Sequence, residues 1–491
     1  MVVWALILIP TLAGAAAFFL RADGLRRALL GATAAVHLGL TAVCWTRPQG
    51  LAVNAWLAVD AASLLLLTCT SVLFFAASIY GIGYLRHEAG HRETDFEEGF
   101  LFGNLREATF TGCLLLFLAA QTLVMVSTHL GLIWVAMEAT TLASAPLITF
   151  HRHHRSLEAA WKYLLICSVG IALALMGNFC VAVAASFGEG GPVHLTIQAL
   201  TENAGRLDPA WLKAAFIMAL VGYGTKMGLA PLHTWLPDAH SEAPSMVSAL
   251  LSGALLNCAF LALLRMATVL TAAGMGGFAA DLLVLFGLLS MGVAAMFMVS
   301  QTDFKRLLAY SSVEHMGILS LGVGWGGLAG SGAMLHALNH SLTKGLLFLA
   351  AGNLLTVYKT KRIDQVRGAI RVAPATAGLW LAGSLAITGS PPFGLFVSEL
   401  TILRGGLYGG HGVAVALYLL FLGVVFVAMA RVSLNMAYGP APEGMPLGNR
   451  EPWWSVLAPG LLVLPVLVLG LLVPKGLQIL LSQAAQGAGV R

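Results

Sequence analysis

Charged residues are scarce in this 491-residue sequence: Asp, Glu, Lys and Arg together make up 10% of it. A soluble globular domain carries about 25%. Hydrophobic residues make up 58% of the chain, and the mean hydropathy is +0.84. This composition excludes a soluble globular fold, and the modest net charge of +5 gives no sign of a nucleic-acid partner.

Clustered cysteines are also lacking. The six cysteines are scattered through apolar stretches without CxxC spacing, at Cys44, Cys69, Cys113, Cys167, Cys180 and Cys258. They therefore suit neither a disulfide framework nor an iron–sulfur cluster. The sequence has no haem-type motif and no nucleotide-binding loop, so we expect the chain to hold no metal or cofactor of its own.

Long apolar stretches, by contrast, recur from end to end. Each is about 20 residues long, which is the length that a helix needs to cross a bilayer. We therefore predict an all-α, polytopic membrane protein with about 14 transmembrane helices. The predicted centres lie near residues 11, 36, 68, 118, 139, 173, 222, 257, 290, 316, 342, 388, 424 and 464. Residues 1–20 lack the basic start and the cleavage site of a signal peptide, so we expect them to remain as the first helix.

Lysine and arginine are divided unevenly between the two sets of loops. The basic loops lie near residues 21–27, 86–106, 152–155, 305–306, 359–371 and 431–450. Cytoplasmic loops usually carry the excess of basic residues. We therefore predict that these loops face the cytoplasm in a prokaryotic cytoplasmic (inner) membrane, and that both termini lie on the outer side.

One apolar stretch carries a lysine shortly before a helix-breaking residue. Residues 222–245 read GYGTKMGLAPLHTWLPDAHSEAPS, with Lys226 in the helix and Pro231 predicted to break it. A lysine at the bilayer centre costs about 2.5–3.5 kcal/mol, so it persists when it is paired, hydrated or functional. Interrupted helices beside a buried charge form ion sites near the midplane of transport proteins.

A second intramembrane charge, Glu138, lies within the stretch LGLIWVAMEATTLASAPLITF. A buried carboxyl group can remain neutral, but acids inside a membrane usually mark an ion path. Lys226 is the expected partner of Glu138. Pairing lowers the cost of burying both charges and couples their titrations.

The most regular polar pattern is HALNHSLTK, in which His336, His340 and Lys344 recur every four residues along one helix face. Two histidines at this spacing can bind zinc, but no third acid or thiol is in register on the helix. Hydrogen bonding between helices is another alternative. We favour a proton relay, because imidazole titrates near neutral pH and both ring nitrogens exchange protons.

A second broken helix is predicted at GSPPFG, residues 389–394, with Glu399 about two turns beyond. Two interrupted helices, each with one charge, suggest a pair of inverted five-helix repeats. We predict these repeats at residues 105–270 and 280–438. Residues 1–100 form a three-helix segment with a cytoplasmic loop, and residues 450–491 form an anchor helix.

Five further polar residues are path or linker candidates: Asn257, Glu314, His315, Asp238 and His240. Asn257 can hold a water or join two helices without carrying charge itself. Glu314 and His315 are adjacent on a helix and point in different directions, so at most one is expected to face a given path.

Four stretches together carry a family resemblance: TKMGLAPLHTWLPDAHSEAPS, QTDFKRLLAYSS, HALNHSLTKGLLFLAAGN and GSPPFGLFVSEL. They resemble the antiporter-like proton-channel subunits of respiratory complex I. This family also includes Mrp-type cation/proton antiporters and the membrane arms of energy-converting hydrogenases. The resemblance runs from about residue 60 to about residue 440. SSVEHMGI and LEAAWKYLLICSVGIALALMG are most similar to the hydrogenase-4 component F branch.

This resemblance implies a role for each charged position. Glu138 and Lys226 would be the ion pair that drives switching, and Glu399 would lie in the exit half of the path. His336, His340 and Lys344 would form the central relay. Asn257 departs from the pattern, because several complex I members have a lysine there. The link between the half-channels must then use water, His336 or another group.

The resemblance also implies partners. These are other antiporter-like and small membrane subunits, surrounding lipid, and a peripheral hydrogenase or other redox module carrying iron–sulfur clusters and a nickel–iron site. We expect a subunit that moves protons in a respiratory complex of the energy-converting hydrogenase or formate hydrogenlyase type, without catalysing redox chemistry itself. The alternatives are a subunit of a redox-independent Mrp-type sodium/proton antiporter, and a structural subunit whose charges only hold the bundle together.

Overall fold

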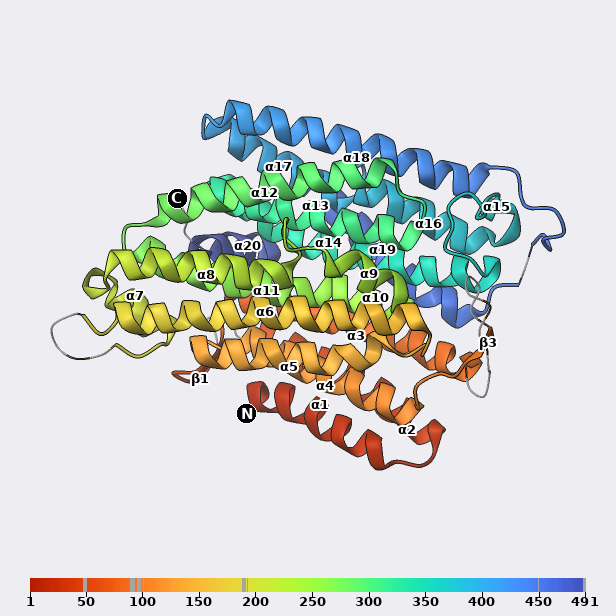
Figure 1. Cartoon of the computed structure of the whole chain (residues 1–491), viewed down its shortest axis with the longest axis horizontal. Coiled ribbons are helices and arrows are strands. Elements are labelled where there is room, and N and C mark those ends of the chain that lie inside the picture. The colour runs from red at the N-terminus through yellow and green to blue at the C-terminus, as the bar shows by residue number, and fades with distance from the viewer. Residues whose placement is uncertain are drawn as a thin grey trace.

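The computed structural model describes residues 1–46, 51–88, 93–94, 99, 101–187, 191, 193–448 and 450–488. Most of them form long helices that run side by side along one axis (Figure 1). By length and composition alone, eleven helices in this part of the chain can cross a membrane. The predicted all-α membrane fold is therefore confirmed, whereas the exact number of crossings and the inverted repeats stay predictions.

The N-terminal part consists of three long helices and two small antiparallel hairpins that were not predicted. The helices are α1 (Val2–Phe19), α2 (Asp23–Trp45) and α3 (Ala61–Glu88). The hairpins pair β1 (Leu51–Asn54) with β2 (Leu57–Val59), and β3 (Glu93–Thr94) with β4 (Leu101–Phe102). Helix α1 packs against α2 and α4 (Glu107–Val126), so the first apolar stretch is part of the bundle.

The central part of the chain contains the first broken helix. Its elements are α5 (Leu130–Ile148), α6 (His154–Ala184), α7 (Ile197–Glu202), a 3₁₀ turn (Ala204–Arg206), α8 (Pro209–Met227), α9 (Trp235–Glu242), α10 (Ser245–Leu250), a π-helical turn (Leu251–Leu255) and α11 (Leu256–Ala272). The π-helical turn was not predicted. Such turns often occur at functional sites, and this one ends at Leu255, shortly before Asn257.

The C-terminal part contains the second broken helix. Its elements are α12 (Gly276–Val299), α13 (Phe304–Trp325), α14 (Gly327–Tyr358), α15 (Ala369–Val372), α16 (Pro374–Ile387), α17 (Gly394–Tyr408), α18 (Gly412–Tyr438), α19 (Trp453–Leu471) and α20 (Lys475–Ala488). The segment expected to be one anchor helix therefore contains two helices, α19 and α20. The second of them, α20, folds back and packs against α3 and α14. Leu477, Leu480, Leu481 and Ala484 form the buried face of α20.

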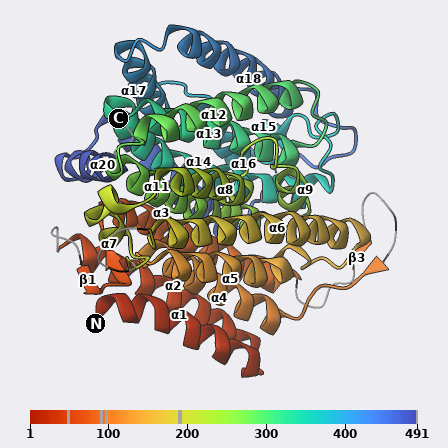
Figure 2. The ribbon, with the colours of Figure 1, turned by 60° about the vertical axis from the view of Figure 1, so that its left-hand side comes forward.

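The two sets of loops lie at opposite ends of the bundle. The turn between α1 and α2, strand β3 and helix α15 lie at the right-hand end in Figure 1, whereas the start of α1, strand β1 and helix α7 lie at the other. Figure 2 shows that α1 and α2 form one edge of the molecule and α18 the opposite edge. The basic regions at the α1–α2 turn and at α15 thus lie at the same end of the bundle, and which end faces the cytoplasm stays a prediction.

Both predicted helix breaks exist, but the first begins earlier than expected. Helix α8 ends at Met227, because Gly228 takes the left-handed conformation with φ 85°. The chain remains irregular past Pro231 until α9 begins at Trp235, so the prediction that the proline itself ends the helix is wrong. The second break separates α16 from α17 and contains Gly389, with φ 63°.

Helices α6 and α8 approach each other through glycines, which predicts a stability effect. A Cβ atom at Gly222 would lie 2.5 Å from the carbonyl oxygen of Gly170 and 2.6 Å from the backbone nitrogen of Ala174. Replacing Gly222 by valine will therefore push the helices apart and destabilise the fold by about 1–3 kcal/mol. The midpoint of thermal unfolding in detergent will fall, whereas Gly378→Ala, where a Cβ meets nothing within 4 Å, will leave it unchanged. An unchanged midpoint in the Gly222→Val variant would contradict this packing.

Candidate functional site

Lys226 lies at the first helix break, with its ammonium group fully buried between two hydroxyl groups. Its Nζ donates to Thr141 Oγ1 of α5 at 2.7 Å and to Tyr163 OH of α6 at 2.7 Å. Nζ also lies 4.7 Å from the centre of the Tyr163 ring. Because Lys226 is in the last turn of α8, the negative end of the helix dipole favours its positive charge.

Glu138 does not form the expected direct ion pair with Lys226 among the described residues. The Thr141 hydroxyl lies between them: it accepts from Lys226 and is 3.5 Å from Glu138 Oε2. Glu138 Oε1 is 3.4 Å from Ser168 Oγ of α6. The two charges are thus coupled through one intervening hydroxyl group, and a small movement of α5 changes the field that acts on Lys226.

This arrangement predicts that Thr141 connects the two charges. Replacing Thr141 by valine keeps the shape of the side chain and removes the hydroxyl, so proton movement by the assembled protein will slow by about threefold to tenfold. The matched control is Thr140→Val, because the Thr140 hydroxyl bonds only to the Met137 carbonyl oxygen on its own helix. Equal rates in the two variants, measured with a pH-sensitive dye in membrane vesicles, would exclude this role.

Asn257 joins the two halves of the bundle instead of carrying charge. Its Nδ2 donates to Ser341 Oγ of α14 at 2.7 Å and to the Gly253 carbonyl oxygen at 3.1 Å. A second contact, between Ser252 Oγ and Ser312 Oγ at 2.8 Å, joins the π-helical turn to α13. These contacts match the interhelical role that the sequence left open for Asn257.

Lys344 is the second fully buried lysine, and it lies on α14 beside α13. Its Nζ donates to the Leu308 carbonyl oxygen at 2.6 Å and to Ser311 Oγ. Glu314, which is also buried, interacts electrostatically with Lys344. His340 is buried one turn earlier on α14, with no hydrogen-bond partner for either ring nitrogen within the described chain. Lys344 and His340 therefore lie together in the centre, as the α14 pattern predicted.

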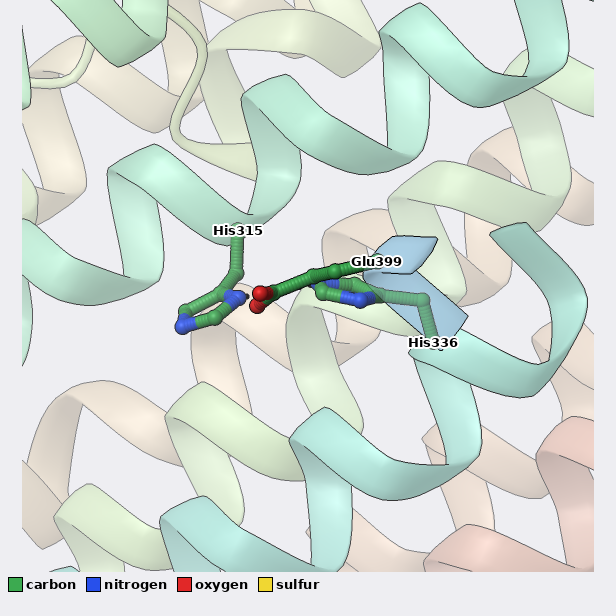
Figure 3. A group of neighbouring side chains, drawn as sticks. All are labelled: His315, His336 and Glu399. Atoms are coloured by element: carbon green, nitrogen blue, oxygen red, sulfur yellow. Dashed lines mark hydrogen bonds between the residues drawn. The ribbon is translucent and has the colours of Figure 1, made fainter. Parts of the chain in front are cut away.

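The second helix break brings three side chains together from three helices. His315 Nδ1 of α13 lies 2.9 Å from His336 Nε2 of α14. The carboxylate of Glu399, from α17, points toward this pair (Figure 3), and one ligand atom of each residue lies within 4.8 Å of the others. Of the adjacent residues Glu314 and His315, His315 is the one that contacts His336. No pattern within a single helix could show this convergence.

Asp238 and His240 have different surroundings although both lie on α9. Asp238 accepts from Lys162 at 3.0 Å and pairs with Arg306 at 3.1 Å, and all three side chains are partly exposed. These ion pairs join α9 to α6 and α13 near the basic end of the bundle. His240 is fully buried against the ring of Phe348 of α14, 5.5 Å between centroids. Of these two residues, His240 is therefore the one placed near the central polar groups.

A cavity of about 100 Å³ opens at the basic end of the bundle. Its lining includes Glu242, which pairs with Lys361 at 2.7 Å, and the buried Lys305. His151, in the loop between α5 and α6, lines it as well, and burial lowers the pKa of its imidazole to about 3. This imidazole is therefore neutral at physiological pH. The cavity lies beside the end of α9, where Ser241 and Glu242, the two residues after His240, line it.

Comparisons with known proteins agree with this arrangement. The family model described as "NADH:quinone oxidoreductase/Mrp antiporter, TM" matches residues 127–426. The chain is 35% identical over 407 residues to the hydrogenase-4 component F homolog of Methylacidiphilum infernorum, covering 82% of each chain. It is 30% identical over 428 residues to hydrogenase-4 component B of Escherichia coli, covering 81% of this chain and 59% of that protein. A chain of the archaeal membrane-bound sulfane sulfur reductase has the same fold, with a TM-score of 0.86 at 20% identity, covering 99% of this chain and 97% of that chain.

Proposed function

This chain belongs to the family of membrane subunits shared by NADH:quinone oxidoreductases and Mrp antiporters, and from that premise we propose that it translocates protons in a membrane-bound respiratory complex. The observation that carries the proposal is the row of buried ionisable residues between the two helix breaks. Its members are Lys226, His240, Lys344, Glu314, His340, His315, His336 and Glu399. Burying so many ionisable groups is costly, which favours a function for them over a purely structural role.

In the proposed mechanism, the first break controls proton movement and the second passes the proton on. Movement of Glu138 relative to Lys226 changes the field on the lysine, because the Thr141 hydroxyl contacts both side chains. A change of one pKa unit corresponds to about 1.4 kcal/mol. Moving one charge through 100 mV costs about 2.3 kcal/mol. Modest changes in the separation of the two charges are therefore enough to gate a proton.

The route between the two breaks has no lysine at position 257. We propose that a proton leaving Lys226 passes beside the hydrogen-bonded pair of Asn257 and Ser341 and reaches Lys344 and His340. The imidazoles of His315 and His336 then transfer it toward Glu399, since a ring that receives a proton on one nitrogen can release one from the other. Uptake begins at the cavity of the basic end, which we place on the cytoplasmic side of a prokaryotic inner membrane, with both termini outside.

The energy for this movement comes, in the proposal, from redox chemistry in partner subunits of a complex of the energy-converting hydrogenase or formate hydrogenlyase type. The partners are other antiporter-like and small membrane subunits and a peripheral module with iron–sulfur clusters and a nickel–iron site. The likeness to two hydrogenase-4 components favours such a complex over a redox-independent antiporter.

Purification of the native complex tests this assignment. The tagged protein is extracted in mild detergent, and every subunit that remains bound is identified by mass spectrometry. We expect a hydrogenase-like or other iron–sulfur module among them. Recovery of small membrane subunits alone, together with sodium-dependent proton exchange in vesicles without an electron donor, would replace the proposal by the sodium/proton antiporter.

A further inference from the structure

Two imidazoles and one carboxylate converge within the bundle in the way that a metal site requires. His315, His336 and Glu399 come from α13, α14 and α17, and one ligand atom of each lies within 4.8 Å of the others (Figure 3). The two histidines are 1% and 0% exposed. We propose that this group binds a divalent transition-metal ion, best matched by Zn²⁺, in the position that a proton occupies between the two imidazoles.

The outer hydrogen bonds fix which nitrogens face inward. His315 Nε2 lies 3.1 Å from the Ile387 carbonyl oxygen, which can only accept, so Nε2 carries the hydrogen. His336 Nδ1 lies 3.0 Å from Ser398 Oγ. Ser398 Oγ lies 2.9 Å from the Leu395 carbonyl oxygen as well, so its hydroxyl can donate either to that oxygen or to His336 Nδ1. Each outer nitrogen therefore has a polar partner that orients its ring, as the outer nitrogens of zinc-binding histidines do.

One hydrogen lies between the two inner nitrogens. His315 Nδ1 and His336 Nε2 are 2.9 Å apart, a separation that requires a hydrogen between them. Because His315 Nε2 donates to the Ile387 carbonyl oxygen, His336 Nε2 is the donor to His315 Nδ1. Ser398 can then donate to His336 Nδ1, and each ring holds one hydrogen. A metal ion would take the place of the hydrogen between the two inner nitrogens. This exchange balances without loss of a proton: the His336 hydrogen moves from Nε2 to Nδ1, Ser398 donates to the Leu395 carbonyl oxygen, and the two inner lone pairs bind the ion.

Glu399 supplies the negative charge and the third ligand. Its Oε1 has no hydrogen-bond partner within the described chain. The backbone of Gly389 lies directly beside Oε2, because a Cβ atom there would be 1.9 Å from it. This contact limits how far the carboxylate can turn away from the imidazoles. Glu399 retains 8% exposure, the most of the three ligands, so the ion is expected to reach the site from its side.

The ligand set and its dimensions suit zinc. Zinc binds imidazole nitrogen and carboxylate oxygen at about 2.0–2.2 Å, in sites that keep a fourth position open. Tetrahedral coordination needs the two inner nitrogens to move apart to about 3.3 Å, a small change from the hydrogen-bonded distance. His340, whose ring centre is 5.2 Å from that of His315, is a further imidazole beside the site. The other titratable groups packed around it are Glu314, Lys344 and Tyr418.

Zinc binding is independent of the proposed function, whereas its expected effect on transport rests on that function. An ion that occupies both inner nitrogens prevents either from accepting a proton. Zinc is therefore expected to stop proton movement through α13 and α14. This differs from the interpretation of the sequence, which looked for a third ligand only on the helix of His336 and found none.

The test compares zinc bound by the intact purified complex with zinc bound by three variants that carry the same partner subunits. We expect one additional zinc per wild-type complex, and a loss of affinity of at least about tenfold in His315→Gln, His336→Gln and Glu399→Gln. His37→Gln is the matched control, because the His37 ring is equally buried and its two nitrogens contact the hydroxyl groups of Ser71 and Thr122, which are poor zinc ligands. Zinc X-ray absorption of the wild-type complex is expected to show nitrogen and oxygen ligands at about 2.0–2.2 Å.

Three outcomes decide the proposal. Zinc binding that is the same in the three variants as in the wild type would overturn the proposal. It would also be overturned if the wild-type complex bound no more zinc than the Glu399→Gln complex. Size-exclusion chromatography identifies any variant that fails to assemble. If a variant fails, the X-ray absorption of the wild-type complex tests the proposed ligands, and zinc bound by sulfur would overturn the proposed site. Zinc binding that leaves proton movement unchanged would keep the metal site and contradict its place in the proton path.

Discussion

Replacing Lys226 by methionine will abolish proton movement by the assembled complex while the redox activity of its partner subunits remains measurable. Methionine fills a similar volume without charge, so the group held by Thr141 and Tyr163 can no longer bind a proton. A loss of about tenfold or more is expected, because each factor of ten needs only about 1.4 kcal/mol. The measurement is electron-driven pH change in sealed membrane vesicles, normalised to electron transfer.

Lys162→Met is the matched control for this variant. Lys162 lies at the surface of α6, where it pairs with Glu158 at 2.7 Å and with Asp238. Exposed pairs of this kind contribute about 0–1 kcal/mol, so proton movement will stay near the wild-type rate. Proton movement at the wild-type rate in the Lys226→Met variant would show that this lysine only stabilises the bundle.

Replacing Glu399 by glutamine will have the second-largest effect. Glutamine keeps the size and hydrogen-bonding capacity of the side chain but cannot be ionised, so the carboxylate beside His315 and His336 no longer accepts a proton from them. We expect proton movement to fall by about tenfold or more, with normal assembly. The control is Glu158→Gln on the exposed face of α6. An equal decrease in both variants would show that the effect is not specific to the second break.

The sequence predicts the bundle well, since the apolar stretches needed to cross a bilayer appear directly in it. Each predicted centre falls within a helix, except that near residue 388, which falls at the break between α16 and α17. Helix α20 was missed, although Leu477, Leu480, Leu481 and Ala484 repeat at helical spacing. The first break was placed at Pro231, whereas Gly228 ends the helix by taking a left-handed conformation. The sequence alone does not show which of two neighbouring helix-breaking residues ends the helix.

The candidate site was predictable only along single helices. His336, His340 and Lys344 share one face of α14, and that pattern is visible in the sequence. The contact between His315 and His336 depends on how α13 packs against α14. The position of the Thr141 hydroxyl between Glu138 and Lys226 depends on how α5 and α8 both pack against α6. Such contacts are set by tertiary packing, to which helical spacing gives no access.

The central claim is that electron transfer in partner subunits drives protons through this chain. Its most direct test is the internal pH of sealed vesicles containing the complex, in sodium-free buffer, after addition of formate or hydrogen as electron donor. The proposal predicts a pH change that accompanies electron transfer, is abolished by a protonophore and is absent in the Lys226→Met variant. Electron transfer without any pH change, or a pH change that needs sodium and no electron donor, would contradict it.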